Sequence, residues 1–216
     1  MGILKSILFG SEGCYESKIA NISFEKLDRP GYSLIEGAKG SNFFHNCVCY
    51  LAEKCLTSKA FILATQGYLH TLVHELGHAG TYKYFTTHAP NVTIITNHCS
   101  GFTSYFPRFY RSASPIKKTI MNIGGPMSNM IFSSTKLIAA AALKDYISWP
   151  VALVLGTGSV VWMSGELLYA FTSAYKQDQG DFGCIAERSK VHLVISAAAL
   201  IGQYALGILG TAALLT

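Results

Sequence analysis

Hydrophobic residues gather in four long stretches of the chain, separated by short polar segments. These stretches cover residues 60–85, 120–143, 149–175 and 191–216, and the last of them contains no Asp, Glu, Lys or Arg. Each is long enough to cross a bilayer, because about 20 helical residues span its hydrocarbon core. The pattern therefore predicts an all-α integral membrane protein with about four transmembrane helices.

Two shorter patterns lie outside these stretches. Residues 92–96 and 102–106 are rich in β-branched and aromatic residues and flank an Asn/Ser/Gly turn, which predicts a β-hairpin within the loop 88–107. Residues 1–58 mix polar and apolar positions with Gly and Pro, which indicates an extramembrane N-terminal segment. We therefore expect three units: this segment, a core of residues 59–190, and a C-terminal transmembrane helix at 191–216.

Composition supports a membrane location and narrows the choice of partners. Half of the 216 residues are hydrophobic and only 13% are charged, a balance typical of small multi-pass membrane proteins. The net charge of +5 is spread along the loops, without a basic run interleaved with aromatic residues. This argues against a nucleic-acid partner and makes the lipid bilayer the expected surroundings.

The first hydrophobic stretch contains the motif H-E-L-G-H at residues 74–78. On a helix, His74 and His78 share one face a turn apart, which suits two ligands of a tetrahedral zinc ion, and Glu75 beside them is a candidate general base. A chance match to this motif in a chain of this length has odds of about one in a hundred. The alternative is a buried helix with two hydrogen-bonded histidines, but ionisable residues inside a membrane are costly unless they serve a function.

Further polar residues lie inside or next to the spans. His70 shares the face of the motif one turn earlier, where it is either a packing residue or a partner of the metal ligands. Lys136 lies within the second span and either reaches the membrane surface or pairs with Glu166 of the third. Small residues such as Gly125 and Ser128 in the second span let helices approach closely.

Two carboxylates follow the third span, and counting spans places them on the side where the first helix ends. Either Asp178 or Asp181 can therefore meet the two histidines of the motif. A third protein ligand would leave the fourth position of a tetrahedral zinc site for water.

Three motifs in this order resemble those of the site-2 protease family, the intramembrane zinc metalloproteases. They are H-E-L-G-H at 74–78, G-P-M-S-N at 125–129 and G-D-F-G at 180–183, and the resemblance covers roughly residues 60–190. It implies a three-helix catalytic core in which His74, His78 and Asp181 hold Zn²⁺ and Glu75 acts as the base. It also implies that Asn129, with Gly125, orients the substrate backbone or stabilises the oxyanion.

The third motif departs from the family pattern. The usual Asn and Pro residues before the aspartate are missing, and Phe182 follows Asp181 where glycine is typical. This leaves Asp178, His88 and His98 as alternative third ligands. No PDZ-like insert fits between the second and third spans, where only about five residues are available.

The resemblance implies an intramembrane endopeptidase that cuts a transmembrane or membrane-proximal segment of another protein. Such a substrate must unwind, and the hairpin of loop 88–107 is our candidate for receiving the extended strand. Two alternatives are a catalytically inactive relative that binds membrane helices and a bundle that conducts metal ions or protons. The oligomeric state is not predicted.

The charges of short loops predict the orientation. Basic residues crowd the loops on the side of the motif, against Lys144 in the short loop opposite, so the positive-inside rule puts the site near the cytosolic face. The N-terminal segment would then lie outside, although its own basic residues weaken the argument. Its four cysteines would pair in an oxidising compartment and stay reduced otherwise, and no C-x-x-C pair predicts a zinc finger.

Overall fold

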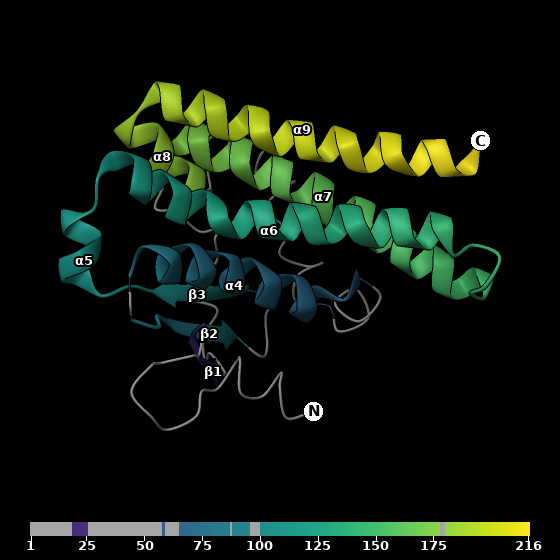
Figure 1. Ribbon diagram of the computed structural model, residues 1–216, viewed down its shortest axis with the longest axis horizontal. Helices are drawn as coiled ribbons and strands as arrows, with labels where there is room; N and C mark the ends of the chain where they lie inside the picture. Colours follow the sequence, from purple (N-terminus) through teal and green to yellow (C-terminus); the bar gives the residue numbers. More distant parts are fainter. Residues whose placement is uncertain (1–18, 26–57, 59–64, 87, 96–99, 178–179) are drawn as a thin grey trace.

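The computed structural model describes residues 19–25, 58, 65–86, 88–95, 100–177 and 180–216. These residues are mostly helical and include a small three-stranded sheet (Figure 1). The helices are α4 (Gly67–Phe85), α5 (Pro107–Ser112), α6 (Pro115–Ala142), α7 (Trp149–Lys176), α8 (Asp181–Arg188) and α9 (Lys190–Leu215). The strands are β1 (Asn21–Glu25), β2 (Asn91–Ile95) and β3 (Ser100–Ser104). The four cysteines of the N-terminal segment lie outside the described residues.

Helix α6 is the central helix of the molecule. It packs against α4, α7 and α9, and the three long helices α6, α7 and α9 run side by side along the long axis (Figure 1). Apolar side chains from α6, α7, α8 and α9 meet in one buried cluster, which includes Met130, Met163, Phe182 and Leu200. Ser114 caps the start of α6 by accepting a hydrogen bond from the Lys117 amide, so the helix begins before the predicted residue 120.

Two of the four expected spans meet the length and apolarity of a membrane helix. Within the described residues these are α7 and α9, and most of their apolar length faces outward instead of into the bundle. The other two expected spans form helices α4 and α6, which are too polar to pass the same test. The reason is visible in their sequences, because α4 and α6 carry polar side chains that are buried in the molecule, among them His70, Glu75, Asn122 and Asn129.

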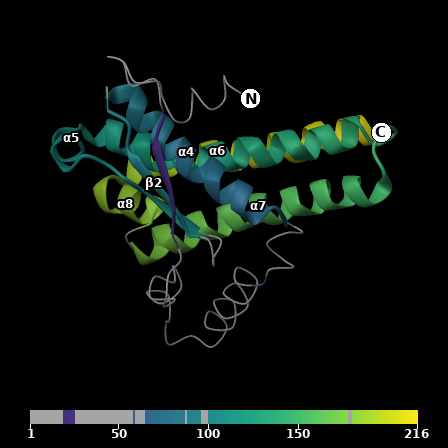
Figure 2. The ribbon, with the colours of Figure 1, turned by 90° about the horizontal axis from the view of Figure 1, so that it is seen from below.

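The predicted hairpin is confirmed as β2 and β3, which pair antiparallel with Val92 opposite Thr103 and Ile94 opposite Gly101. Sequence reasoning missed β1, which pairs parallel to β2 from the N-terminal segment. Val92 and Ile94 turn toward α4 and pack with its Ala79 in a second buried cluster. Since the strand order is β1-β2-β3, β3 lies at one edge of the sheet, and it also contacts α4. Strand β2 lies against α4 as well (Figure 2).

Small residues let α4 and α6 cross in close contact. A Cβ atom at Gly77 of α4 would overlap the carbonyl of Gly124 and lie 2.5 Å from the Ser128 hydroxyl, and a Cβ at Gly124 would lie 2.6 Å from Thr81 Oγ1. Real Cβ atoms do not approach so closely, so neither position tolerates a side chain without a shift of the helices. The predicted close approach at the second span is thereby confirmed.

Candidate metal centre

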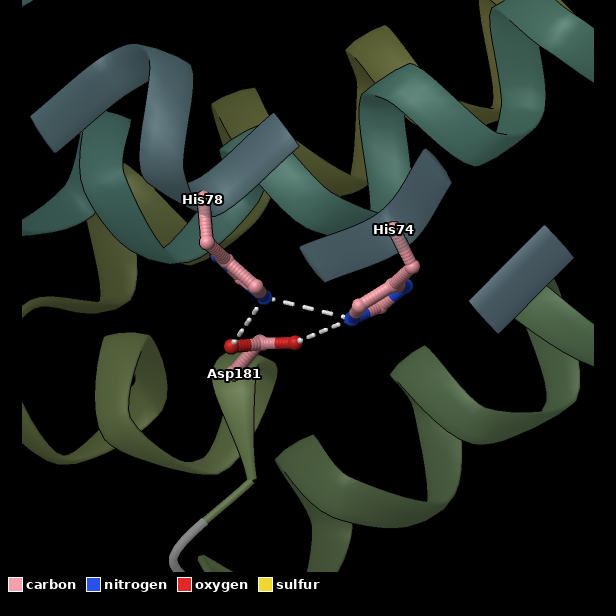
Figure 3. A group of neighbouring side chains, drawn as sticks. All are labelled: His74, His78 and Asp181. Carbon is pink, nitrogen blue, oxygen red and sulfur yellow. Dashed lines mark hydrogen bonds and ion pairs between the residues drawn. The ribbon is translucent and has the colours of Figure 1, made fainter. Parts of the chain in front are cut away.

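Two helices bring three potential metal ligands together. His74 and His78 project from α4, and Asp181 projects from the first residue of α8 (Figure 3). The two Nε2 atoms are 3.2 Å apart; His74 Nε2 lies 3.3 Å from Asp181 Oδ2, and His78 Nε2 lies 3.3 Å from the other oxygen, Oδ1. In a tetrahedral zinc site with bonds of 2.0–2.1 Å, neighbouring ligand atoms are about 3.3 Å apart. The group is therefore able to hold a metal ion.

Hydrogen bonds on the far side of each imidazole determine which nitrogen faces the centre. His78 Nδ1 lies 2.8 Å from the Met121 carbonyl, and His74 Nδ1 lies 3.2 Å from Glu166 Oε1. Both partners only accept, so each Nδ1 carries the proton and donates it. The Gly125 amide also lies 3.3 Å from His78 Nδ1, but the carbonyl is nearer and requires the N–H.

This arrangement leaves both Nε2 lone pairs aimed at the same point as the Asp181 carboxylate. The two Nε2 atoms and the two Asp181 oxygens are four electron-rich atoms with separations of 3.2–3.3 Å between the Nε2 atoms and from each Nε2 to one oxygen, and they repel one another unless a proton or a metal ion lies among them. Neutral imidazole with its second nitrogen tied to a carbonyl or a carboxylate is the usual form of a metal-bound histidine. The donor set thus fits a divalent metal ion.

Asp181 is held in place by its own neighbours. Its amide donates to the Tyr169 hydroxyl at 3.0 Å, and its carbonyl accepts from Asn122 Nδ2 at 3.3 Å. Burial alone would raise the pKa of the Asp181 carboxyl, but in the metal-free protein, with a proton on the histidine Nε2 atoms, the charge of His78 and the hydrogen bonds to both histidines outweigh burial and hold the pKa well below its usual range. The side chain is therefore a carboxylate, the form that binds a metal.

Of the alternative third ligands, only His88 belongs to the described residues. It is exposed and its ring lies 5.2 Å from that of Phe106, away from the metal cluster. Asp178 and His98 lie outside the described residues.

Glu75, the candidate base, is buried between α4 and the edge strand β3. The Thr103 hydroxyl lies 2.7 Å from Glu75 Oε2, to which it donates, and 3.2 Å from the Glu75 carbonyl. A Cβ atom at Gly101 would lie 2.9 Å from Glu75 Cγ, so the strand approaches closely because it carries glycine there. Sequence reasoning missed the contact between Thr103 and Glu75, since it joins residues from different elements.

Gly125 and Asn129 take positions that the motif alone does not reveal. A Cβ atom at Gly125 would overlap the His78 imidazole and lie 2.7 Å from His74 Cδ2, so this glycine makes room for the two ligands. Asn129 is 1% exposed, and its side chain bonds to His70 and Glu166. Its side-chain amide is therefore hydrogen-bonded inside the helix bundle and does not face an open surface.

His70 and Lys136 belong to the same buried region. His70 Nδ1 lies 2.6 Å from Asn129 Oδ1, and Lys136 Nζ lies 3.0 Å from His70 Nε2. The His70 ring also stacks on Trp162 with centroids 4.9 Å apart. Lys136 thus reaches Glu166 through His70 and Asn129, a longer route than the direct pair expected.

In comparisons with protein family models, curated proteins and solved structures, none matches this chain. The functional assignment must therefore rest on the residues and their geometry. Sequence reasoning named all three residues of the metal cluster. It missed the bond between Glu166 and His74, for which the available signal was an acidic residue inside an apolar helix.

Proposed function

We propose that this protein is an intramembrane zinc metalloendopeptidase, which hydrolyses peptide bonds in or near a transmembrane segment of another protein. The observation that carries the proposal is the convergence of His74 Nε2, His78 Nε2 and the Asp181 carboxylate, with the buried Glu75 on the same helix turn. Two imidazoles and one carboxylate form the ligand set of many zinc hydrolases.

Zinc is the metal that this donor set favours. The distances of 3.2–3.3 Å between ligand atoms match a tetrahedral edge, and three protein ligands leave one position open. When bound there, zinc supplies a Lewis acid that polarises a carbonyl and lowers the pKa of a bound water. Because two histidines and a carboxylate also suit iron(II), the metal content has to be measured.

Glu75 is the proposed general base. Its position next to His74 puts a carboxylate beside the metal cluster, and Thr103 holds Oε2 by a 2.7 Å hydrogen bond. The carboxylate would take the proton of the attacking water and pass it to the leaving amide nitrogen. General base catalysis of this kind contributes about 10²–10⁴-fold to a rate.

The edge strand β3 is the proposed binding place for the substrate backbone. A helical peptide bond is shielded by its own hydrogen bonds, so the substrate must be extended before it is cut. An extended segment can add to the edge of a sheet through its main-chain groups. Strand β3 fits this task because its Thr103 touches Glu75, which brings an added strand close to the base.

Membrane insertion is supported by the outward apolar faces of α7 and α9. Side chains such as Leu153, Phe171, Ile195 and Leu206 are 45–64% exposed, which suits contact with lipid. Helices α4 and α6 would span as well, with their polar residues turned toward each other. The basic loops near the site favour a cytosolic location of the metal centre.

The proposal is tested by comparing metal content and cleavage in one set of purified proteins. The wild type, Glu75→Gln and Asp181→Ala are prepared in detergent with Glu187→Gln as a control, since Glu187 is exposed on α8. Zinc is measured by elemental analysis, and cleavage of a transmembrane peptide by mass spectrometry. We expect Glu75→Gln to keep zinc and lose cleavage by at least about 100-fold. Asp181→Ala should lose both, and Glu187→Gln should retain both.

Two results would contradict the proposal. One is cleavage that survives Glu75→Gln at the wild-type rate. The other is a wild-type protein that holds no zinc when purified without chelators. Zinc binding without cleavage of any transmembrane peptide would point to the inactive, helix-binding relative instead.

A further inference from the structure

A chain of buried and partly buried polar side chains runs from Lys136 of α6 to His74 of the metal cluster. Lys136 Nζ lies 3.0 Å from His70 Nε2, and His70 Nδ1 lies 2.6 Å from Asn129 Oδ1. Asn129 Nδ2 then bonds to Glu166 Oε1, which also lies 3.2 Å from Nδ1 of the metal-cluster residue His74. The chain connects α6, α4 and α7 behind the metal centre.

The chemistry of the groups fixes the direction of each bond. An ammonium group only donates, so His70 accepts from Lys136 at Nε2 and donates from Nδ1 to the Asn129 carbonyl oxygen. The Asn129 amide nitrogen then donates to Glu166 Oε1. His74 donates to the same oxygen. Glu166 Oε1 therefore accepts two hydrogen bonds, one from His74 and one from Asn129.

These groups are built into the core. His70 is 0% exposed, Asn129 1% and Glu166 6%. The Ser133 hydroxyl lies 3.3 Å from His70 Nδ1, and Trp162 covers the His70 ring. Burying polar groups is costly unless each is hydrogen-bonded, and Glu166 Oε2 has no hydrogen-bond partner among the described residues, so an apolar core would be more stable. The arrangement therefore calls for a function that an apolar core cannot supply.

We propose that Glu166 is a positioning residue for the metal ligand His74, and that Asn129, His70 and Lys136 hold Glu166 in place. The inference rests on the proposed metal centre and deepens it. A carboxylate behind an imidazole fixes the proton on Nδ1, orients the ring and makes Nε2 a stronger ligand. Lys136 supplies the positive charge at the far end of the chain, so the bundle carries the buried Glu166 carboxylate without a direct ion pair next to the metal.

The test measures metal binding, which is independent of proteolysis. Zinc affinity is determined by competition with a chelator for wild type, Glu166→Gln and the exposed control Glu187→Gln. The visible absorption spectrum of the Co²⁺-substituted proteins reports the ligand geometry. We expect Glu166→Gln to lower zinc affinity by about 10–100-fold and to change the Co²⁺ spectrum, because loss of such a partner typically has this effect. Glu187→Gln should match the wild type in both measurements.

A second variant keeps the inference testable if Glu166→Gln does not fold. Asn129→Leu removes the other hydrogen bond to Glu166 Oε1 and leaves the carboxylate and His74 intact. We expect its zinc affinity to fall by less than that of Glu166→Gln and its Co²⁺ spectrum to shift in the same direction. The unfolding of the metal-free wild type and variants is also measured by denaturant titration, so that a general loss of stability can be told apart from a loss of metal affinity.

The outcomes separate this inference from the proposed function. Wild-type zinc affinity and an unchanged Co²⁺ spectrum in the folded variants would overturn the role of Glu166. A wild type that binds zinc but cuts no peptide, together with weakened binding in Glu166→Gln, would support the role of Glu166 and contradict the protease. A wild type that binds no metal would overturn both.

Discussion

At the scale of single residues, the candidate metal centre depends on glycines that leave room beside its ligands as well as on the ligands themselves. Gly125 of α6 faces the two histidines of α4, and any side chain there would overlap the His78 ring. The motif G-P-M-S-N therefore contributes a space next to the ligands. The contact between Glu75 and Thr103 also depends on a small neighbour, because Gly101 lets β3 approach Glu75, the proposed base.

Replacing Gly125 by alanine is expected to disrupt the metal centre. The added Cβ would push His78 and His74 out of the geometry in which their Nε2 atoms are 3.2 Å apart. We expect zinc affinity to fall by at least about 10-fold, on the scale of lost partners of metal ligands. The measurement is chelator competition, with Gly165→Ala of α7 as the control, since its Cβ meets nothing within 4 Å. Equal affinities in the two variants would contradict this account.

At the scale of elements, the pair of α4 and α6 positions the chemistry. Gly77 and Gly124 allow the two helices to come into contact. This contact brings the polar side chains of α6, such as Asn129, within hydrogen-bonding distance of α4. The edge strand β3 and the short helix α8 then add Thr103 and Asp181 from either side. The site is therefore assembled from four elements, of which α4 contributes the most.

A pair of alanine substitutions on α4 tests the helix contact. Gly77→Ala forces α4 and α6 apart and should lower the free energy of unfolding by about 1–3 kcal/mol, the usual cost of overpacking. Gly80→Ala, one turn along the same helix, meets nothing within 4 Å and should raise it by up to about 1 kcal/mol, since alanine is the better helix former. Denaturant titration of both variants is the measurement. Destabilisation by Gly80→Ala and not by Gly77→Ala would contradict the contact described.

Sequence reasoning found local features more readily than contacts between elements. The i, i+4 spacing of His74 and His78 needs only a helix, and the hairpin of β2 and β3 needs only two neighbouring runs, so both were predictable. The pairing of β1 with β2 joins residues about 70 positions apart, and nothing in either strand specifies it. The bond from Glu166 to His74 was hidden for the same reason, because it depends on how α7 packs against α4.

At the scale of the whole molecule, polarity separates the helices into two groups. Helices α7 and α9 turn apolar side chains outward, whereas α4 and α6 enclose the polar groups and the metal cluster. Such an arrangement is the reverse of a water-soluble bundle, in which the apolar faces would be hidden. It agrees with lipid around the outside and a small polar interior.

An arginine placed on the outward face of α9 tests this arrangement. Leu206 is 64% exposed within α9, and Leu206→Arg should cost about 2.5–3.5 kcal/mol of insertion if that position lies deep in a bilayer. We expect less of this variant in the membrane fraction, measured by flotation on a density gradient. The control is Val191→Arg, which is equally exposed but lies at the first turn, where a long side chain reaches the surface. A wild type that remains in solution without membranes or detergent would contradict a membrane location.

During translation, Asp181 of α8 is synthesised last of the three residues of the metal cluster. The two histidines are synthesised about a hundred residues before the aspartate, and the two long helices α6 and α7 are synthesised between them. A nascent chain that ends short of residue 181 contains the proposed base and two of the three candidate ligands but lacks Asp181. The proposed enzyme would thus stay harmless to neighbouring membrane proteins until its own core is assembled.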